Sequence, residues 1–357
     1  METDFLLNSY HYDLDPAKIA QRPWNPRDES KLLVYDKKSD SIEIIPFFQL
    51  SNFIPKDSLI ILNNSQVVPS RVKARKPTGG NIEVFFLDLV TPNELGHYKV
   101  LLKSNHPKKL HQEIILPFRN SIVAKITKIE GKVFELCIPL SLTQLLDELK
   151  FYGEIPIPPY IRHGNSDAID KQDYQCTYAD SNKAGSIAAP TAGLHFTPRV
   201  FNCLKEKNIT WDFVSLFVGA GTFFPITSQD IRDHAMHEEF FSIPQNIFNE
   251  VKRREPNKQN EKKIFAVGTT SLRVLESAYQ GINYLPDVLQ STNIFLHPGK
   301  KIESIDGLIT NFHLPCSSLI VLVSSLIGRS KTLELYQYAL QNNFRFYSYG
   351  DAMLVRL

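Results

Sequence analysis

The 357-residue sequence predicts an α/β parent domain that carries an inserted small all-β, barrel-like domain. Short alternating runs follow one another from Arg71 to about Pro139 between Gly, Pro and Asn turns, which is typical of a small barrel or sandwich. Farther along the chain, helix-like and strand-like segments alternate, which indicates α/β layers. We therefore expect a discontinuous α/β domain at 1–70 and 151–357 and a barrel-like insert at 71–150.

A buried strand is expected just before the insert. Leu59–Asn63 (LIILN) is a continuous β-type run that ends in the polar pair Asn63-Asn64, so it delivers polar groups at its carboxyl end. The insert then supplies shorter runs of alternating polarity. Its expected strands are Ile82–Leu89, Tyr98–Leu102, Glu113–Leu116 and Lys132–Ile138.

Helices and a rigid connector follow the insert. Ser141–Lys150 (SLTQLLDELK) predicts an amphipathic helix that begins at a Ser. Tyr152–Tyr160 (YGEIPIPPY) is a rigid connector, because prolines fix φ and disfavour both helix and central strand. Lys252–Lys263 is expected to be a charged loop that contains a proline. The other expected helices are Thr197–Lys207, Gln245–Arg254, Thr270–Tyr279 and Lys331–Asn342. The other expected strands are Val214–Val218, Ile264–Val267 and Ile294–Leu296.

The composition excludes several classes of protein. A hydrophobic share of 43% excludes wholesale disorder, and 40 Lys and Arg against 38 Asp and Glu exclude a histone-like polycation. The four cysteines form no CxxC pair, so neither a disulfide framework nor a thiolate zinc site is expected. The amino terminus lacks a secretory signal, and the longest apolar run, Ser317–Gly328, has 12 residues where a membrane span needs about 20. We expect a cytoplasmic monomer without a membrane segment.

The segment Gly185–Thr197 (GSIAAPTAGLHFT) is the first candidate site. Its glycines permit positive φ, and its small residues leave backbone amides able to meet anions or ring nitrogens. Thr197 precedes Pro198, which predicts a helix N-cap with Pro at the first position, and a helix start beside such a loop suits phosphate or carboxylate. The alternative is a structural loop whose Thr197 only caps the helix. The candidate binding residues here are Gly185, Ser186, Thr191 and Thr197.

The second candidate is His234–Glu239 (HAMHEE). His234 and His237 are three residues apart and would share a helix face with Glu238 or Glu239. A His pair with a carboxylate can bind a metal or carry out acid–base chemistry. No HExxH pattern accompanies the pair, and capping or surface histidines are commoner than ligands. A metal-dependent hydrolase built on these residues stays open as a competing hypothesis.

Two glycine-containing turns follow strand-like runs, at Phe217–Thr222 (FVGAGT) and Val267–Ser271 (VGTTS). Ligands bind at the carboxyl ends of strands in α/β sheets, so both turns are well placed. The first lacks the third glycine of the dinucleotide fingerprint, so a Rossmann nucleotide site is not indicated. Arg273 either forms a surface pair with Glu276 or clamps a carboxylate. The candidate binding residues here are Gly219, Gly221, Thr222, Thr269, Thr270 and Arg273.

Two further segments combine aromatic and polar residues. LITNFHLP contains Asn311 and His313, and RFYSYGDAM near the carboxyl terminus contains Tyr349 and Asp351. Aromatic rings beside amides and a carboxylate suit a planar heterocycle, although clustered aromatics are more often core.

Basic residues open the insert at Arg71, Lys73 and Arg75, with Lys103 farther along it. Period-two spacing puts the first three on one strand face, where they can contact nucleic-acid phosphates. A charged edge strand that protects itself from aggregation has the same pattern. A non-catalytic RNA-binding protein is therefore a third hypothesis.

Several blocks of the sequence form a recognisable series. They include IAQRP at Ile19–Pro23, SKLLV at Ser30–Val34, Gly185–Thr197, VGAGTF at Val218–Phe223, His234 with Met236–His237 and Glu239, GTTSLR at Gly268–Arg273, Thr310–Pro315 and FYSYGDAM at Phe346–Met353. In order and spacing, nearly from end to end, they resemble the S-adenosylmethionine:tRNA ribosyltransferase-isomerase family of queuosine biosynthesis. The resemblance implies an α/β parent with a β-barrel insert.

The resemblance also implies an activity. The ribosyl moiety of S-adenosylmethionine is transferred and isomerised onto 7-aminomethyl-7-deazaguanine at the tRNA wobble position. The products are epoxyqueuosine-tRNA, adenine and methionine. The implied partners are the precursor-bearing tRNA and S-adenosylmethionine as co-substrate, with no metal and no further cofactor.

This chemistry assigns tasks to the candidate residues. The sulfonium acidifies C5′ of the ribosyl group, and a neutral imidazole is a suitable base for it. Asp351 or a second histidine can assist the departure of adenine, and Glu239 can deprotonate the incoming amine. Arg273 or the amides near Thr269-Thr270 can bind the methionine carboxylate. The sequence does not rank the candidate bases, which are His195, His234, His237 and His313.

Four positions depart from the family's usual residues. Phe217 replaces a His, so that position cannot be an essential base in this protein. Gln66 replaces an Arg, with Ser65 before it in place of Thr, and Asn293 replaces an Asp. Each change weakens a functional role at that position, while the main blocks remain whole.

Overall fold

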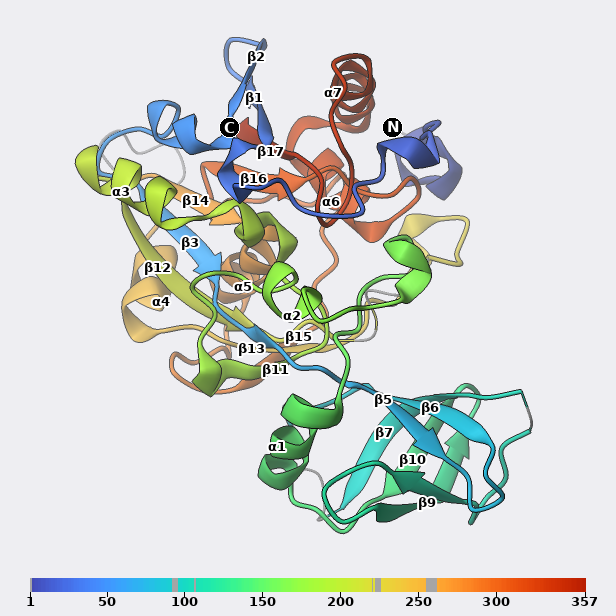
Figure 1. Ribbon diagram of the computed structural model, residues 1–357. Coiled ribbons are helices and arrows are strands. Elements are labelled where there is room, and N and C mark those ends of the chain that lie inside the picture. The colour runs from blue at the N-terminus through green and yellow to red at the C-terminus, as the bar shows by residue number, and fades with distance from the viewer. Residues whose placement is uncertain (1, 92–95, 106, 220, 222–225, 255–261) are drawn as a thin grey trace.

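The computed structural model describes residues 2–91, 96–105, 107–219, 221, 226–254 and 262–357 (Figure 1). The described residues form an α/β part, which holds both ends of the chain, and a β-barrel set to one side of it (Figure 1). The predicted fold class, an α/β parent with a barrel-like insert, is therefore confirmed. The proposed domain limits stay a prediction.

A mixed sheet lies at the centre of the α/β part. Within the described residues its nine strands are, in order across the sheet, β15 (Gln290–Thr292), β13 (Glu239–Ser242), β12 (Thr210–Leu216), β3 (Leu59–Asn63), β14 (Ile264–Val267), β16 (Gly307–Asn311), β17 (Ala352–Arg356), β1 (Lys31–Asp36) and β2 (Ser41–Pro46). Strands β12, β3, β14 and β16 run parallel, and β17 pairs antiparallel with β16. The expected strands β3 and β14 are confirmed at both ends. A short parallel pair joins β4 (Gln66–Val67) to β11 (Ala184–Ser186).

Helices occupy most of the expected places. They are α1 (Leu142–Tyr152), α2 (Asp170–Asp173), α3 (Pro198–Glu206), α4 (Gln245–Lys252), α5 (Gly268–Gln280), α6 (Ser318–Ile327) and α7 (Arg329–Gln341). A capping box at Ser141 begins α1, and Thr197 caps α3 with Pro198 at its first position, as predicted. Among the described residues no helix is long and apolar enough to cross a membrane, and the strongly apolar α6 has only 10 residues.

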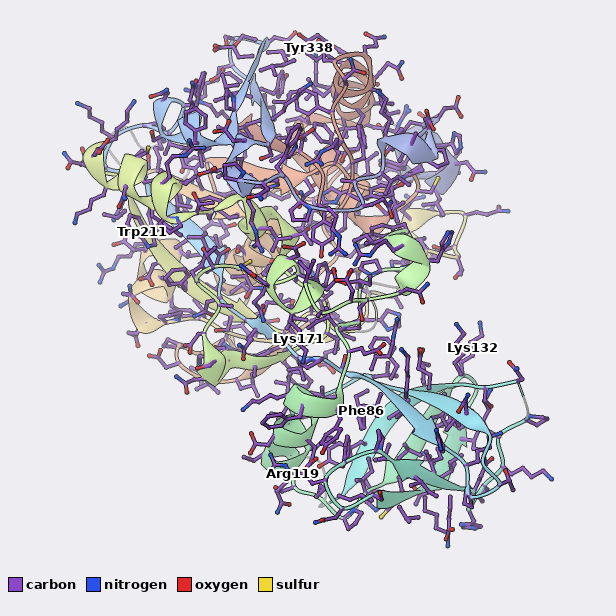
Figure 2. The ribbon with its side chains drawn as sticks, in the orientation of Figure 1. Phe86, Arg119, Lys132, Lys171, Trp211 and Tyr338 are labelled. Carbon is purple, nitrogen blue, oxygen red and sulfur yellow. The ribbon has the colours of Figure 1, made fainter. Side chains whose placement is uncertain are left out.

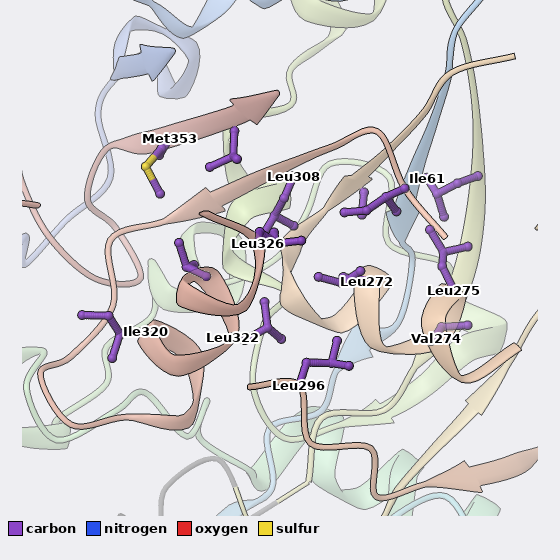
Figure 3. Close-up of a cluster of buried hydrophobic side chains, with 14 of the residues drawn as sticks. Ile61, Leu272, Val274, Leu275, Leu296, Leu308, Ile320, Leu322, Leu326 and Met353 are labelled. Carbon is purple, nitrogen blue, oxygen red and sulfur yellow. The ribbon is translucent and has the colours of Figure 1, made fainter. Parts of the chain in front are cut away.

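The sheet has an apolar layer on each face because its central strands are continuous apolar runs. Successive residues of β3 point to opposite faces. Ile61 belongs to a cluster with Leu272 of α5 and Leu308 of β16 (Figure 3), whereas Leu62 belongs to a second cluster that includes Phe196. Burial on both faces fixes the register of the parallel strands, and with it the edge where their carboxyl ends meet.

Two expected elements are wrong. His234–Glu239 is not a helix, because His234 ends a 3₁₀ turn and Glu239 begins β13, which pairs with β12. Ile294–Leu296 is not a strand. The strand of that region, β15, ends at Thr292, whose hydroxyl accepts the backbone N–H of Ile294 at 3.1 Å and turns the chain. Both errors arise from pairing and turn contacts that periodicity does not reveal.

Six strands within the described residues close into a barrel. In order around it they are β10 (Val133–Cys137), β7 (His97–Lys103), β6 (Asn81–Phe86), β5 (Arg71–Arg75), β8 (Glu113–Leu116) and β9 (Ile122–Glu130). Alternate residues point inward, as in β5, where Val72 and Ala74 are buried while Lys73 and Arg75 are exposed. Leu145 of α1 packs into the same core, so the barrel has an apolar interior of its own.

The chain enters and leaves the barrel at one place. Arg71 and Glu154 exchange two backbone hydrogen bonds, of 3.3 and 2.7 Å, and the Arg71 guanidinium donates to the carbonyl of Gly164 at 2.6 Å. Gly153 makes this crossing possible, because a Cβ there would lie 1.8 Å from the carbonyl oxygen of Pro69. The two connections are therefore held side by side.

The crossing predicts a steric cost for a side chain at Gly153. Gly153→Ala should lower the free energy of unfolding by about 2 kcal/mol or more, because the new methyl group meets backbone oxygen rather than a side chain that can move. Urea unfolding of the whole chain measures this change. Gly80→Ala is the matched control, since its nearest neighbour would be the Lys76 side chain at 3.8 Å. Equal stabilities of the two variants would contradict the prediction.

Candidate active site

A pocket of about 320 Å³ lies at the carboxyl edge of the parallel strands. Its wall includes Val218 beyond β12, Thr269 beyond β14 and Phe312 beyond β16. Loops at this edge leave backbone and polar groups without strand partners, which is why α/β sheets bind ligands there. Ten of the predicted site residues line the pocket: Thr191, Gly221, His234, His237, Glu239, Thr269, Thr270, Arg273, Asn311 and His313.

The start of α5 forms one wall of the pocket. Strand β14 passes directly into α5 through Gly268, whose φ of +83° is a conformation that L side chains rarely adopt. The N-cap residue Val267 offers no side-chain hydrogen bond. First-turn amides without a side-chain cap carry the positive end of the helix dipole, so this wall suits an anionic group.

A buried ion pair stands beside that helix start. The Arg273 guanidinium donates through Nη1 to Glu239 Oε2, and the backbone N–H of Gly219 donates to Glu239 Oε1 at 3.0 Å. Arg273 Nε also donates to the carbonyl of Ile294 at 3.3 Å, whereas its Nη2 is buried without a hydrogen-bond partner in the described structure. The expected surface pair of Arg273 with Glu276 is wrong, because Glu276 is buried and accepts the hydroxyl of Ser304 instead.

His195 lies behind the pocket wall and not in it. The residue is 4% exposed, and its Nδ1 lies 2.8 Å from Ser30 Oγ while its Nε2 lies 3.3 Å from Asn311 Nδ2. Its ring stacks on Phe47 with centroids 4.9 Å apart. Burial lowers the pKa of His195 to about 4, with a backbone hydrogen bond to Arg27 opposing the shift. The imidazole is therefore neutral at physiological pH.

His313 lies in the pocket wall and is also held neutral. Its Nε2 lies 2.8 Å from the hydroxyl of Thr310, and its backbone N–H donates to Tyr336 at 3.1 Å. Burial lowers the pKa of His313 to about 3. A neutral imidazole in this position offers a lone pair or an N–H to a ligand but no charge.

His234 and His237 also line the pocket, and they lie on the loop that precedes β13. Burial, followed by the nearby His237, lowers the pKa of His234, and its ring packs edge-on against Phe295 at 5.5 Å. Within the described part of the chain, no group of three or more His, Cys, Asp or Glu side chains is placed to hold a metal ion. Both oxygens of Glu239, the predicted third member, already accept hydrogen bonds.

Other predicted residues lie outside the pocket lining. Ser186 accepts the N–H of Val218 at 3.0 Å, Tyr349 donates to Asp170 at 3.3 Å, and the Thr197 hydroxyl donates to Asp28. Gly185 packs against the barrel loop at Leu89 and Val90, and Gly219 contributes its N–H to Glu239. Thr222 falls outside the described residues.

Asp351 also has a place apart from the pocket. Its carboxylate accepts the backbone N–H of Lys31 at 2.9 Å and of Arg345 at 2.7 Å, and the indole N–H of Trp24 at 2.9 Å. Burial raises the pKa of Asp351, although these hydrogen bonds oppose the shift. The carboxylate ties the carboxyl-terminal loop to the start of β1, while its role in adenine departure stays a prediction.

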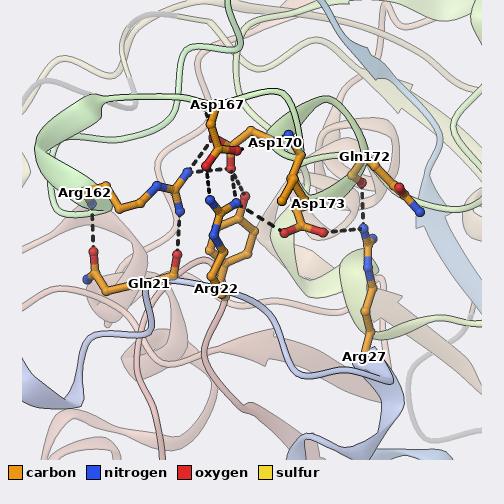
Figure 4. Close-up of polar contacts among 10 residues, drawn as sticks. Gln21, Arg22, Arg27, Arg162, Asp167, Asp170, Gln172 and Asp173 are labelled. Atoms are coloured by element: carbon orange, nitrogen blue, oxygen red, sulfur yellow. Dashed lines mark hydrogen bonds and ion pairs between the residues drawn. The ribbon is translucent and has the colours of Figure 1, made fainter.

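Sequence reasoning missed the residues that hold another wall in place. Tyr160 and Tyr174 line the pocket, and the segment that carries them is fixed by an ion-pair network (Figure 4). In that network the buried Asp170 accepts from Arg22 at 3.1 Å and from Arg162 at 2.6 Å. The block IAQRP contributes Arg22, one of the network's arginines, so part of the signal was present in the series of blocks.

The basic residues of the insert take two different places. Arg71 is engaged at the junction, and Lys73 pairs with Glu154 at 2.6 Å. Arg75 and Lys103 are exposed on the outer face of the barrel. Residues 71–150 contain 13 Lys and Arg against 8 Asp and Glu, whereas the rest of the chain contains 27 against 30. Figure 2 shows Arg119 and Lys132 among the side chains that project from this basic barrel.

A pocket lined by histidines and a helix start, beside a basic barrel, is the arrangement of a two-part α/β enzyme. The chain belongs to the queuosine biosynthesis protein family, whose model matches residues 7–355. The family predicted from the sequence is thus confirmed.

Relatives in this family match over nearly the whole chain. The S-adenosylmethionine:tRNA ribosyltransferase-isomerase of Nostoc sp. is 39% identical over 380 residues, which cover 99% of this chain and 92% of that protein. The protein of the same name from Halothermothrix orenii is 38% identical, and the match covers 98% of this chain and 99% of that protein. The crystal structure of the S-adenosylmethionine tRNA ribosyltransferase from Thermotoga maritima matches this structure with a TM-score of 0.52 at 28% sequence identity. The match covers 97% of this chain and 99% of that chain.

The buried neutral His195 predicts a loss of stability in acid. Its pKa is about 4 in the folded chain and 6.5 ordinarily, so the unfolded chain binds a proton more readily below pH 6.5. The contribution of this pKa difference to the free energy of unfolding, on the order of 3 kcal/mol, is present above pH 6.5 and is lost as the pH falls toward 4. Urea unfolding at pH 7.5, 5.5 and 4.5 measures the dependence.

His195→Gln is the comparison variant for this measurement. It should show a shallower loss of stability between pH 6.5 and 4, because glutamine does not titrate. At pH 7.5 the difference in free energy of unfolding between the variant and the wild type measures the cost of altered packing. This difference is subtracted from the differences measured at lower pH. Parallel curves for the two proteins would contradict the assignment of a buried neutral His195.

Proposed function

We propose that the chain is an S-adenosylmethionine:tRNA ribosyltransferase-isomerase. It transfers and isomerises the ribosyl moiety of S-adenosylmethionine onto 7-aminomethyl-7-deazaguanine at the tRNA wobble position and releases adenine and methionine. The observation that carries the proposal is the family match over 7–355, whose blocks GTTSLR and TNFHLP contribute to one pocket. The reaction needs no cofactor beyond S-adenosylmethionine as co-substrate.

The methionine part is assigned to the wall made by α5. Its carboxylate is an anion, and the uncapped helix start together with the Arg273 guanidinium supplies N–H donors and positive charge there. Glu239 is assigned to holding Arg273 and the Gly219 amide, because both of its oxygens are engaged in those contacts. It is therefore a positioning residue in this proposal.

The base that removes the C5′ proton is assigned to the pair His234 and His237. Both line the pocket, and the lowered pKa of His234 keeps a lone pair available at neutral pH. His313 is bonded to Thr310 and suits hydrogen bonding to the departing adenine. His195 does not line the pocket and is not assigned as the base.

The tRNA is assigned to the outer face of the barrel. We take 71–150 as a basic insert on the acidic catalytic part formed by 1–70 and 151–357, which favours phosphate binding on the insert. Arg75 and Lys103 are two of its exposed cations, while Arg71 holds the junction. The protein is proposed to act as a cytoplasmic monomer.

The activity itself is tested by product release. The purified protein, S-adenosylmethionine and tRNA that carries the 7-aminomethyl-7-deazaguanine precursor should together yield adenine and methionine in equal amounts, measured by liquid chromatography. Mature tRNA without the precursor is the control and should yield neither product. Release of adenine without tRNA, or its absence from the complete mixture, would sink the proposal.

Neutralising two of the barrel's exposed cations should weaken tRNA binding in a salt-dependent way. For Arg75→Gln/Lys103→Gln, the slope of log affinity against log salt should shrink by about 1 to 2, because fewer counterions are displaced from phosphates. Filter binding at 50 to 200 mM salt measures the slope. The control Lys56→Gln/Lys205→Gln removes the same charge near the amino ends of the parallel strands. A slope reduced equally in both variants would place the tRNA elsewhere.

A further inference from the structure

Four polar side chains form a continuous hydrogen-bonded chain from the interior to the pocket wall. Ser30 Oγ lies 2.8 Å from His195 Nδ1, and His195 Nε2 lies 3.3 Å from Asn311 Nδ2. Asn311 Oδ1 lies 2.8 Å from the hydroxyl oxygen of Thr191. Ser30, His195 and Asn311 are buried, whereas Thr191 is half-buried and, with Asn311, lines the pocket.

The direction of each hydrogen bond follows from which atoms can donate. Asn311 Nδ2 also lies 3.5 Å from the backbone carbonyl of Asp351, which can only accept, so the NH₂ group of the amide faces His195 and that carbonyl. His195 Nε2 must then carry its lone pair toward Asn311. The ring proton is on Nδ1 and is donated to Ser30 Oγ.

This orientation determines what Thr191 can offer. The carbonyl oxygen of the Asn311 amide faces Thr191 and can only accept, so the Thr191 hydroxyl uses its single hydrogen in that bond. Toward the pocket the hydroxyl then presents lone pairs alone. A ligand group that forms a hydrogen bond with the Thr191 hydroxyl must therefore be the donor.

We propose that Thr191 is a specificity-determining residue whose hydroxyl accepts an N–H from an amino group of the substrate, with Ser30, His195 and Asn311 setting its polarity. The inference rests on the proposed function, because that function supplies the amino groups. They are the exocyclic amine of adenine, the ammonium of methionine and the aminomethyl group of the target base. His195 is then a positioning residue, which acts on the substrate only through Asn311 and Thr191.

Removing the acceptor should weaken recognition of one amino group. We expect Thr191→Val to bind S-adenosylmethionine about fivefold to tenfold more weakly, or to raise the KM for precursor tRNA by that factor. Thr191→Ser should restore most of the loss because it keeps the hydroxyl. Thr210→Val is the matched control, since that hydroxyl bonds the Ser58 carbonyl at the distant amino end of β12. Equilibrium dialysis and initial rates provide the two measurements.

Substrate analogues identify which amino group is accepted. If the loss in Thr191→Val disappears with S-inosylmethionine, which has an oxo group in place of the adenine amine, Thr191 contacts adenine. If it disappears with the analogue that lacks the α-amino group, Thr191 contacts the ammonium. A loss confined to the KM for tRNA assigns the aminomethyl group. Unchanged affinity and unchanged KM in Thr191→Val would overturn the proposal.

His195 variants test the chain behind Thr191. His195→Gln keeps an acceptor for the Asn311 amide and should retain activity within about fivefold, whereas His195→Leu should lose as much affinity as Thr191→Val. In the double variant Thr191→Val/His195→Leu the two losses of affinity should not add, because both substitutions disrupt the same interaction with the substrate. A fall in kcat of more than about a hundredfold in His195→Gln at unchanged affinity would instead identify His195 as a base.

The wild-type protein separates this inference from the proposed function. If it releases adenine and methionine but Thr191→Val behaves as the wild type does, the proposed function stands and the polarity of Thr191 is wrong. If the wild type neither binds nor turns over S-adenosylmethionine, the proposed function fails and this inference fails with it.

Discussion

The buried pair of Glu239 and Arg273 holds the pocket edge together. Each charge is removed from water, so each needs polar partners, and three segments meet in the pair: the start of β13, the second turn of α5 and the loop at Gly219. A further bond from Arg273 fixes the carbonyl of Ile294. The loops that follow β12 and β15 and the start of β13 are thereby set relative to one helix, which gives the pocket one shape.

Two buried histidines in and next to the pocket wall are uncharged. His195 and His313 are buried among apolar and hydroxyl neighbours, which keeps both imidazoles uncharged. Among the described residues that line the pocket, Arg273 beside the start of α5 carries a permanent positive charge. The orientation of hydrogen bonds determines where neutral side chains such as Thr191 offer a donor or an acceptor. A sulfonium substrate is itself cationic, so uncharged histidines around it avoid electrostatic repulsion.

The elements that sequence predicted well are those determined by local interactions. The capping box of α1 and the Thr197 cap of α3 depend on neighbours within three residues, and β3 and β14 are continuous apolar runs. The segment at His234 was assigned to a helix because its spacing fits one, yet its neighbours pair with β12 in the folded chain. The contact of Ser30 with His195 spans 165 residues, so no local pattern could reveal it.

The way the barrel is attached bears on how the chain folds. Strand β3 must pair with β12 and β14, which follow it by well over a hundred residues, and the barrel lies in the intervening chain. Because Arg71 and Glu154 are hydrogen bonded, a barrel that forms first brings the two ends of its own segment together. The loop that remains to be closed is then shorter by the length of the barrel, and its entropic cost is smaller. Forming the barrel first therefore shortens the effective length of chain between β3 and the strands that it must pair with.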